Sequence, residues 1–207
     1  RRDSSRSRQL EDLERSLADP SSYDGMTRQM AAESLVAAKL SRNLERPRVE
    51  TEGRFVRAVR LADTHGSYRQ RLEARYEMLW TGVWWFDDVV AVDQQFDAFA
   101  DLALESDHAV DVEFVSNLVQ VLYNSVIHGL LDREQCKLDA RAARLYQKLE
   151  VLAANAERPN NGLEARTLLV LGRLNQAWLS WDLDAISATW SEFSDILTRA
   201  RPLGEFD

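Results

Sequence analysis

Residues 138–156 read LDARAARLYQKLEVLAANA. Apolar residues recur in this stretch at steps of four, three, four, three and four, which places them on one side of an α-helix. Such a narrow apolar seam is typical of a helix that packs nearly parallel or antiparallel to a neighbouring helix. The seam consists of Leu138, Ala142, Leu145, Leu149, Leu152 and Ala156. The stretch therefore predicts a protein of closely packed helices.

The same periodicity continues on both sides of this seam. On the N-terminal side, Ser67 followed by Gln70 is a capping box that begins another helical stripe. On the C-terminal side, the turn ERPNNG at 157–162 precedes two further helices, predicted over 163–181 and 183–200. Because so short a connection forces neighbouring helices to run antiparallel, we expect these two to form a hairpin. No pair of alternating runs predicts a β-sheet.

These patterns predict an all-α fold, in which antiparallel helical hairpins form an irregular helical bundle or a short α-solenoid. The predicted hairpins recur at about 45–50 residues, as in helical repeat proteins. Leu171-Gly172 and Phe193 resemble positions of the tetratricopeptide unit. However, the period exceeds the roughly 34 residues of that unit, and the alanines that it requires are out of register. The fold is therefore TPR-like at most, and no family is assigned.

The length of 207 residues suits one sizeable domain or at most two small ones. We predict a mobile basic leader over residues 1–8, which contains four arginines, and a single all-helical domain over residues 9–207 with a weak internal break at 157–162. The chain begins at Arg1 instead of Met, so we expect a fragment or a processed product. The arginine-rich start also suits the cytoplasmic flank of a transmembrane segment lying before Arg1.

Composition narrows the class of protein. A single cysteine, Cys136, excludes an internal disulfide and fits a reducing compartment, so we expect a cytoplasmic protein or one on the cytoplasmic face of a membrane. No apolar run is long enough to cross a bilayer, so a membrane would be reached only through a segment absent from this sequence. The net charge of −8 argues against nucleic acid as a partner.

Charge is unevenly distributed along the chain. Residues 76–132 contain eleven acidic residues and no Lys or Arg. Four of the acids follow one another at steps of four and share one side of a predicted helix. We call this set the acidic ridge: Asp93, Asp97, Asp101 and Glu105. Three interpretations stay open: pairing with the N-terminal arginines inside the protein, docking of a basic partner protein, or a divalent-cation site. We predict pairing with the N-terminal arginines for part of the ridge and an exposed remainder near Asp101 and Glu105.

The six tryptophans form two clusters, within residues 80–85 and 178–190. Their spacing predicts that most of them pack in the core between hairpins. Trp85 is adjacent to Trp84 and cannot point in the same direction, which makes it the best candidate for an exposed interface anchor. The candidate interaction residues are Trp85, Asp93, Asp97, Asp101 and Glu105.

No catalytic set is evident, since neither a phosphate-binding loop nor a nucleophile elbow occurs. We therefore predict no catalytic residue, no cofactor and no metal site. Asp87-Asp88 followed by Asp93 is similar to the aspartate-rich motif of class I isoprenoid synthases, which implies magnesium diphosphate binding, but their second metal-binding motif is absent. Glu105 and His108 form one Glu-x-x-His pair. The alternative is thus a small helical metal-dependent enzyme that uses the Asp87/Asp88/Asp93 cluster.

We expect a non-catalytic helical scaffold or regulatory domain that mediates protein–protein interaction, as part of a membrane-anchored protein or on its own. The expected partner is another protein, basic where it binds the acidic ridge. Self-association into a homo-oligomer stays open.

Overall fold

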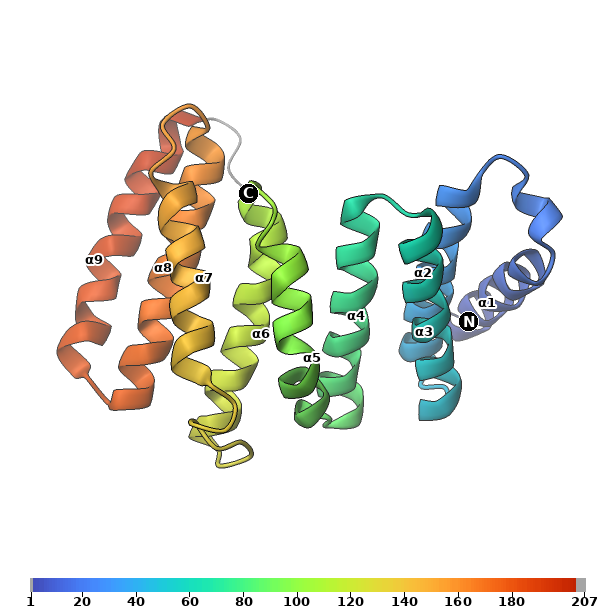
Figure 1. Ribbon diagram of the computed structural model, residues 1–207, viewed down its shortest axis with the longest axis horizontal. Helices are drawn as coiled ribbons and strands as arrows, with labels where there is room; N and C mark the ends of the chain where they lie inside the picture. The colour runs from blue at the N-terminus through green and yellow to red at the C-terminus, as the bar shows by residue number, and fades with distance from the viewer. Residues whose placement is uncertain (1, 204–207) are drawn as a thin grey trace. The chain divides into compact units, whose positions relative to one another are not determined.

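The structure is a computed structural model in which residues 2–203 are described; Arg1, at the start of the predicted leader, and residues 204–207, at the end of the predicted domain, lie outside this range. Within residues 2–203 the chain forms α-helices and two short 3-10 helices, and no strand (Figure 1). The prediction of an all-α fold is confirmed.

The chain divides into two compact units, Arg1–Asp88 and Val89–Asp207. The sequence predicts one domain whose only break lies at 157–162, whereas in the structure that segment lies inside the second unit. Pro159 opens a helix there, as proline does where no amide hydrogen is needed. The sequence also predicts a mobile leader over residues 1–8, but residues 2–8 belong to the first helix.

The first unit is built around three packed helices. Its elements are α1 (Arg2–Ala18), the 3-10 helix η1 (Pro20–Tyr23), α2 (Thr27–Asn43), α3 (Arg48–His65) and α4 (Tyr68–Phe86). Leu35 of α2, Phe55 of α3 and Ala74 of α4 belong to one buried cluster. The predicted capping box begins α4: the Ser67 hydroxyl accepts from the Gln70 amide, and the Gln70 side chain accepts from the Ser67 amide.

The second unit consists of helices that alternate in direction (Figure 1). Its elements are α5 (Val89–Ala103), α6 (Ala109–Ile127), α7 (Leu138–Ala153), α8 (Pro159–Ser180), α9 (Leu183–Ala200) and the 3-10 helix η2 (Arg201–Leu203). α8 packs against α6, α7 and α9, whereas α9 packs chiefly against α8. The Asp182 carboxylate caps α9 by accepting from the Ala185 amide. The predicted hairpin over 163–181 and 183–200 is therefore present.

The apolar seam of α7 is buried as predicted for all but its last member. The buried members are Leu138, Ala142, Leu145, Leu149 and Leu152. Ala156 lies beyond the end of the helix and is exposed. Asp132 followed by Gln135 is a second capping pattern in the sequence, just before the seam. The helix nevertheless begins only at Leu138, because the Asp132 carboxylate accepts from the Glu134 and Gln135 amides and closes a separate turn.

Candidate interaction surface

The acidic ridge lies on the second unit. Asp93, Asp97 and Asp101 are on α5, while Glu105 follows the end of that helix and is exposed. Arg141 of α7 lies 2.5 Å from an Asp93 carboxylate oxygen and 3.0 Å from one of Asp97. Arg144, also on α7, lies 2.6 Å from an Asp101 oxygen. Three of the four ridge carboxylates are thus paired within their own unit.

Arg141 is the central residue of these contacts. Its side chain is buried, it also donates to the backbone carbonyl of Asp93 at 2.9 Å, and its guanidinium lies 4.9 Å from the centroid of the Phe96 ring. The hydrogen bond from Arg141 holds the pKa of Asp97 below its usual value. Burial acts to lower the pKa of Arg141, but the hydrogen bonds to Asp97 and Asp93 outweigh it and raise that pKa. These contacts fasten α5 to α7.

The prediction that the N-terminal arginines pair with the ridge is wrong. Four of those arginines pair inside the first unit: Arg54 and Arg57 with Glu14, Arg42 with Glu77 and Arg48 with Asp88. The ridge takes its cations from α7, where Arg141, Arg144 and Lys148 recur at steps of three and four. Lys148 continues the series by pairing with Asp107 at 3.2 Å. A search for a basic row that matches the acidic row would have found these partners.

Trp85 lies on α4 in the first unit and is partly exposed. The guanidinium of Arg42 lies 4.5 Å from the centroid of its ring, a cation–π contact. Arg42 also donates to Glu77 at 2.6 Å and to Thr81 at 3.0 Å. Burial acts to raise the pKa of Glu77, but hydrogen bonds from Lys39 and Arg42 outweigh it, so the pKa lies below its ordinary value. One side of the Trp85 ring is therefore already occupied by a cation.

The metal-dependent alternative gains no support from the geometry. Among residues 2–203, no group of three or more His, Cys, Asp or Glu side chains is arranged to hold a metal ion. Asp88 is paired with Arg48 at 2.5 Å, and Asp93 with Arg141. A guanidinium nitrogen of Arg158 lies 2.8 Å from His108 Nδ1, so that ring nitrogen already has a partner.

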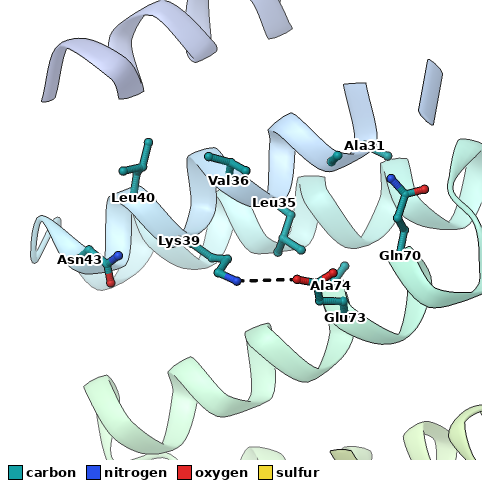
Figure 2. A pocket seen from close by; sticks show the side chains of 10 residues that line it. Ala31, Leu35, Val36, Lys39, Leu40, Asn43, Gln70, Glu73 and Ala74 are labelled. Atoms are coloured by element: carbon teal, nitrogen blue, oxygen red, sulfur yellow. Dashed lines mark ion pairs between the residues drawn. The ribbon is translucent and has the colours of Figure 1, made fainter. Parts of the chain in front are cut away.

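The first unit also contains a groove of about 340 Å³ between α2 and α4 (Figure 2). Alanine and leucine side chains form much of its lining. The two charged side chains in that lining, Lys39 and Glu73, lie 3.7 Å apart and pair with each other. Lys39 also pairs with Glu77 at 2.8 Å. The groove therefore presents no unpaired charge that could select a ligand.

The hairpin of α8 and α9 exposes a set of large apolar side chains, each between 39% and 73% exposed. We call this set the aromatic face: Leu171, Trp178, Trp181, Leu183, Trp190 and Leu197. Trp178 and Trp181 contact each other edge to face, with ring centroids 5.9 Å apart. Trp190 lies 6.4 Å from the half-buried Phe193.

Side chains from both helices point to the same side of this hairpin. Two ion pairs join α8 to α9: Arg166 with Asp195 at 3.2 Å and Arg173 with Glu192 at 2.9 Å. Since an α-helix turns by about 100° per residue, Trp178 lies about 140° around α8 from Arg173, and Trp190 about 160° around α9 from Glu192. The ion pairs therefore occupy one side of the hairpin and the aromatic face occupies the other.

The prediction that the tryptophan clusters pack in the core is wrong for Trp84, Trp178, Trp181 and Trp190, which are all exposed. In α9 the apolar residues cover a wider sector than a single neighbouring helix can bury, and Ile196 fills the contact with α8. Trp181 is the C-cap of α8, with φ of 54°, and so leaves the helical stripe. The sequence signal for this exposure was the number of apolar residues in α9, which is larger than contact with one neighbouring helix requires.

Comparison with family models, with curated proteins and with solved structures found no match for this chain. No helix within residues 2–203 is both long and apolar enough to cross a membrane.

Proposed function

We propose that this protein is a non-catalytic helical scaffold that binds another protein chain through the aromatic face. The observation that carries the proposal is the exposure of three tryptophans and three leucines on one side of a two-helix hairpin. Single exposed apolar side chains are normal, but contiguous patches of this size on soluble domains mark interaction sites. Tryptophan is also enriched among the residues that dominate binding energy.

The electrostatics of the hairpin suit such a role. Arg166 and Arg173 hold Asp195 and Glu192 on the side away from the aromatic face. A partner that covers the face therefore removes apolar surface from water without stranding a charge, which is the usual composition of an interface centre. The single buried cysteine, Cys136, fits a scaffold that works in the reducing cytoplasm.

The acidic ridge is the weaker candidate for a docking site. Arg141 and Arg144 already neutralise three of its four carboxylates, so a basic partner would have to compete with pairs inside the unit. Exposed ion pairs contribute only about 0–1 kcal/mol each, which leaves little to gain from such an exchange.

The proposal is tested by affinity capture with matched variants of the immobilised protein. The test variant is Trp178→Ser/Trp190→Ser, and the control is Val49→Ser/Val56→Ser, which removes two exposed apolar side chains from α3. We expect proteins captured from cell extract by the wild type to be retained by the control and lost from the test variant, with both variants showing native circular dichroism. Undiminished capture by the test variant would contradict the proposal.

A further inference from the structure

We infer that the occupant of the aromatic face is a second copy of this chain, bound by two-fold symmetric packing of one α8–α9 hairpin against another. This inference rests on the proposed function, because it names the partner of the same face. Three properties of the hairpin carry it: the exposed apolar area, the spacing of side chains along α9, and the charge of the surface around them.

The exposed area matches what a stable dimer needs. Trp178, Trp181 and Trp190 are 46%, 73% and 71% exposed. Since a tryptophan buries up to about 250 Å², the three leave about 450 Å² of surface to be covered. Burying a whole leucine gains up to about 3 kcal/mol, which at about 25 cal/mol per Å² corresponds to about 120 Å². The three leucines of the face, which are 39%, 70% and 62% exposed, therefore add at most about 200 Å². Two copies that covered all six side chains completely would thus bury at most about 1,300 Å², which reaches the lower end of the roughly 1,200–2,000 Å² of specific interfaces.

The spacing along α9 suits pairing with an identical helix. Leu183, Trp190 and Leu197 are the large exposed apolar residues of α9 and step by seven, which places them along one line of the helix, whereas Phe193 and Ala200 pack against the cluster that α9 shares with α8. Leu183 and Leu197 lie at equal distances from Trp190, seven residues to either side. When two copies of α9 cross antiparallel at Trp190, Leu183 of each copy meets Leu197 of the other. The row is therefore self-complementary, as a two-fold interface requires.

The charge of the surface favours a second copy over a basic partner. The exposed residues beside the row on α9 carry hydroxyl groups: Ser187, Ser191, Ser194 and Thr198. Glu192 and Asp195 are held by arginines of α8, and Asp184 lies in the first turn, about 100° from the row. Arg201, the exposed C-cap of α9, lies on the same side as Trp190, but an antiparallel crossing at Trp190 places the two copies of Arg201 at opposite ends of the interface. Two chains of net charge −8 therefore repel each other elsewhere, and the row itself brings no like charges together.

The first test measures the mass of the intact chain by sedimentation over a wide range of concentration. We expect the wild type to reach twice its mass of 23.7 kDa, and the control Val49→Ser/Val56→Ser to do the same. Trp190→Ser is expected to raise the dimer dissociation constant about 1,000-fold, because the symmetry removes two copies of a central anchor. Leu183→Ser/Leu197→Ser, which leaves every tryptophan in place, serves as an independent second variant.

The second test fixes the register. Chains carrying Leu183→Cys are mixed with chains carrying Leu197→Cys under mild oxidation. We expect disulfide-linked dimers in the mixture at a much higher yield than with either chain alone. A wild type that stays monomeric at every concentration would overturn self-pairing. Loss of a different captured protein from Trp178→Ser/Trp190→Ser would then still support the proposed function, whereas unchanged capture would refute both.

Discussion

Two arginines on α7 provide a matched pair of perturbations, since Arg141 and Arg144 both bind carboxylates of the acidic ridge from the same helix. They differ in burial: the Arg141 side chain is 8% exposed, whereas Arg144 and its partner Asp101 are 46% and 67% exposed. Replacement by methionine keeps most of the aliphatic stem and removes only the charge and its donors. The two variants therefore separate the contribution of a buried clamp from that of a surface ion pair.

The structure sets the expected magnitude of each change. Removing one partner of a fully buried pair costs about 3–5 kcal/mol, because the other charge stays behind without compensation. Asp93 and Asp97 are 28% and 53% exposed, so water recovers part of this loss once Arg141 is gone. For Arg141→Met we expect a loss of about 2–3 kcal/mol in the free energy of unfolding, near that of one or two charged hydrogen bonds. For Arg144→Met we expect about 0–1 kcal/mol.

Urea unfolding followed by circular dichroism measures both free energies. Double variants with Asp97→Asn are expected to show strong coupling with Arg141→Met, because Arg141 donates hydrogen bonds to Asp97, and only weak coupling with Arg144→Met, because Arg144 acts on Asp97 through charge alone. The reasoning would be refuted if the two methionine variants lost equal free energy of unfolding, or if Arg141→Met lost less than about 1 kcal/mol. Either result would mean that burial does not make the ion pairs of Arg141 more stabilising than that of Arg144.

Three further predictions concern other parts of the molecule. Gly172→Ala would place a methyl group 2.3 Å from Cε1 of Tyr146, so we expect thermal unfolding to show a loss of about 1–3 kcal/mol in the free energy of unfolding. The same substitution should cost less when it is introduced into the Tyr146→Ala variant. Folding lowers the pKa values of Glu77 and Asp97 from their ordinary values of 4.5 and 3.8, so both carboxylates stabilise the folded state at pH values above these. The melting temperature should therefore fall as the pH drops below about 4.5, and it should fall less in the variant Glu77→Gln/Asp97→Asn. Trp190→Ala, measured by urea unfolding at low protein concentration, should change the free energy of unfolding by less than about 1 kcal/mol, because the side chain is exposed; a loss near 3 kcal/mol would show it to be buried.

The helices could be predicted from sequence because their signals are local. The seam of α7 and the Ser67 capping box depend on residues within four positions of each other. The start of α7 was missed for an equally local reason, since Asp132 caps a turn that ends at Lys137 in a left-handed conformation. The same capping pattern begins a single turn or a long helix, so it does not predict the length of the helix.

The candidate site was harder to predict because burial depends on how many neighbours a helix has. Periodicity showed that Trp190 lies on the apolar side of its helix, but not that α9 has one main neighbour and leaves that residue exposed. Similarly, the acidic row on α5 was evident, but its pairing with Arg141 joins residues more than 40 positions apart. Sequence order gave no reason to prefer these partners over the arginines of the first unit.

The attachment of α9 to the second unit chiefly through α8 has a consequence for local unfolding. A small cluster that includes Leu163, Val170 and Ile196 holds the helix in place, with two ion pairs beside it. We expect a helix that packs chiefly against one neighbour to open at a lower free energy than the global transition, so that its amides exchange with solvent while the rest of the unit stays folded. Pairing of two hairpins across the aromatic face would suppress this local opening of α9. The order of the last helix would then depend on protein concentration, and association would complete the folding of the chain.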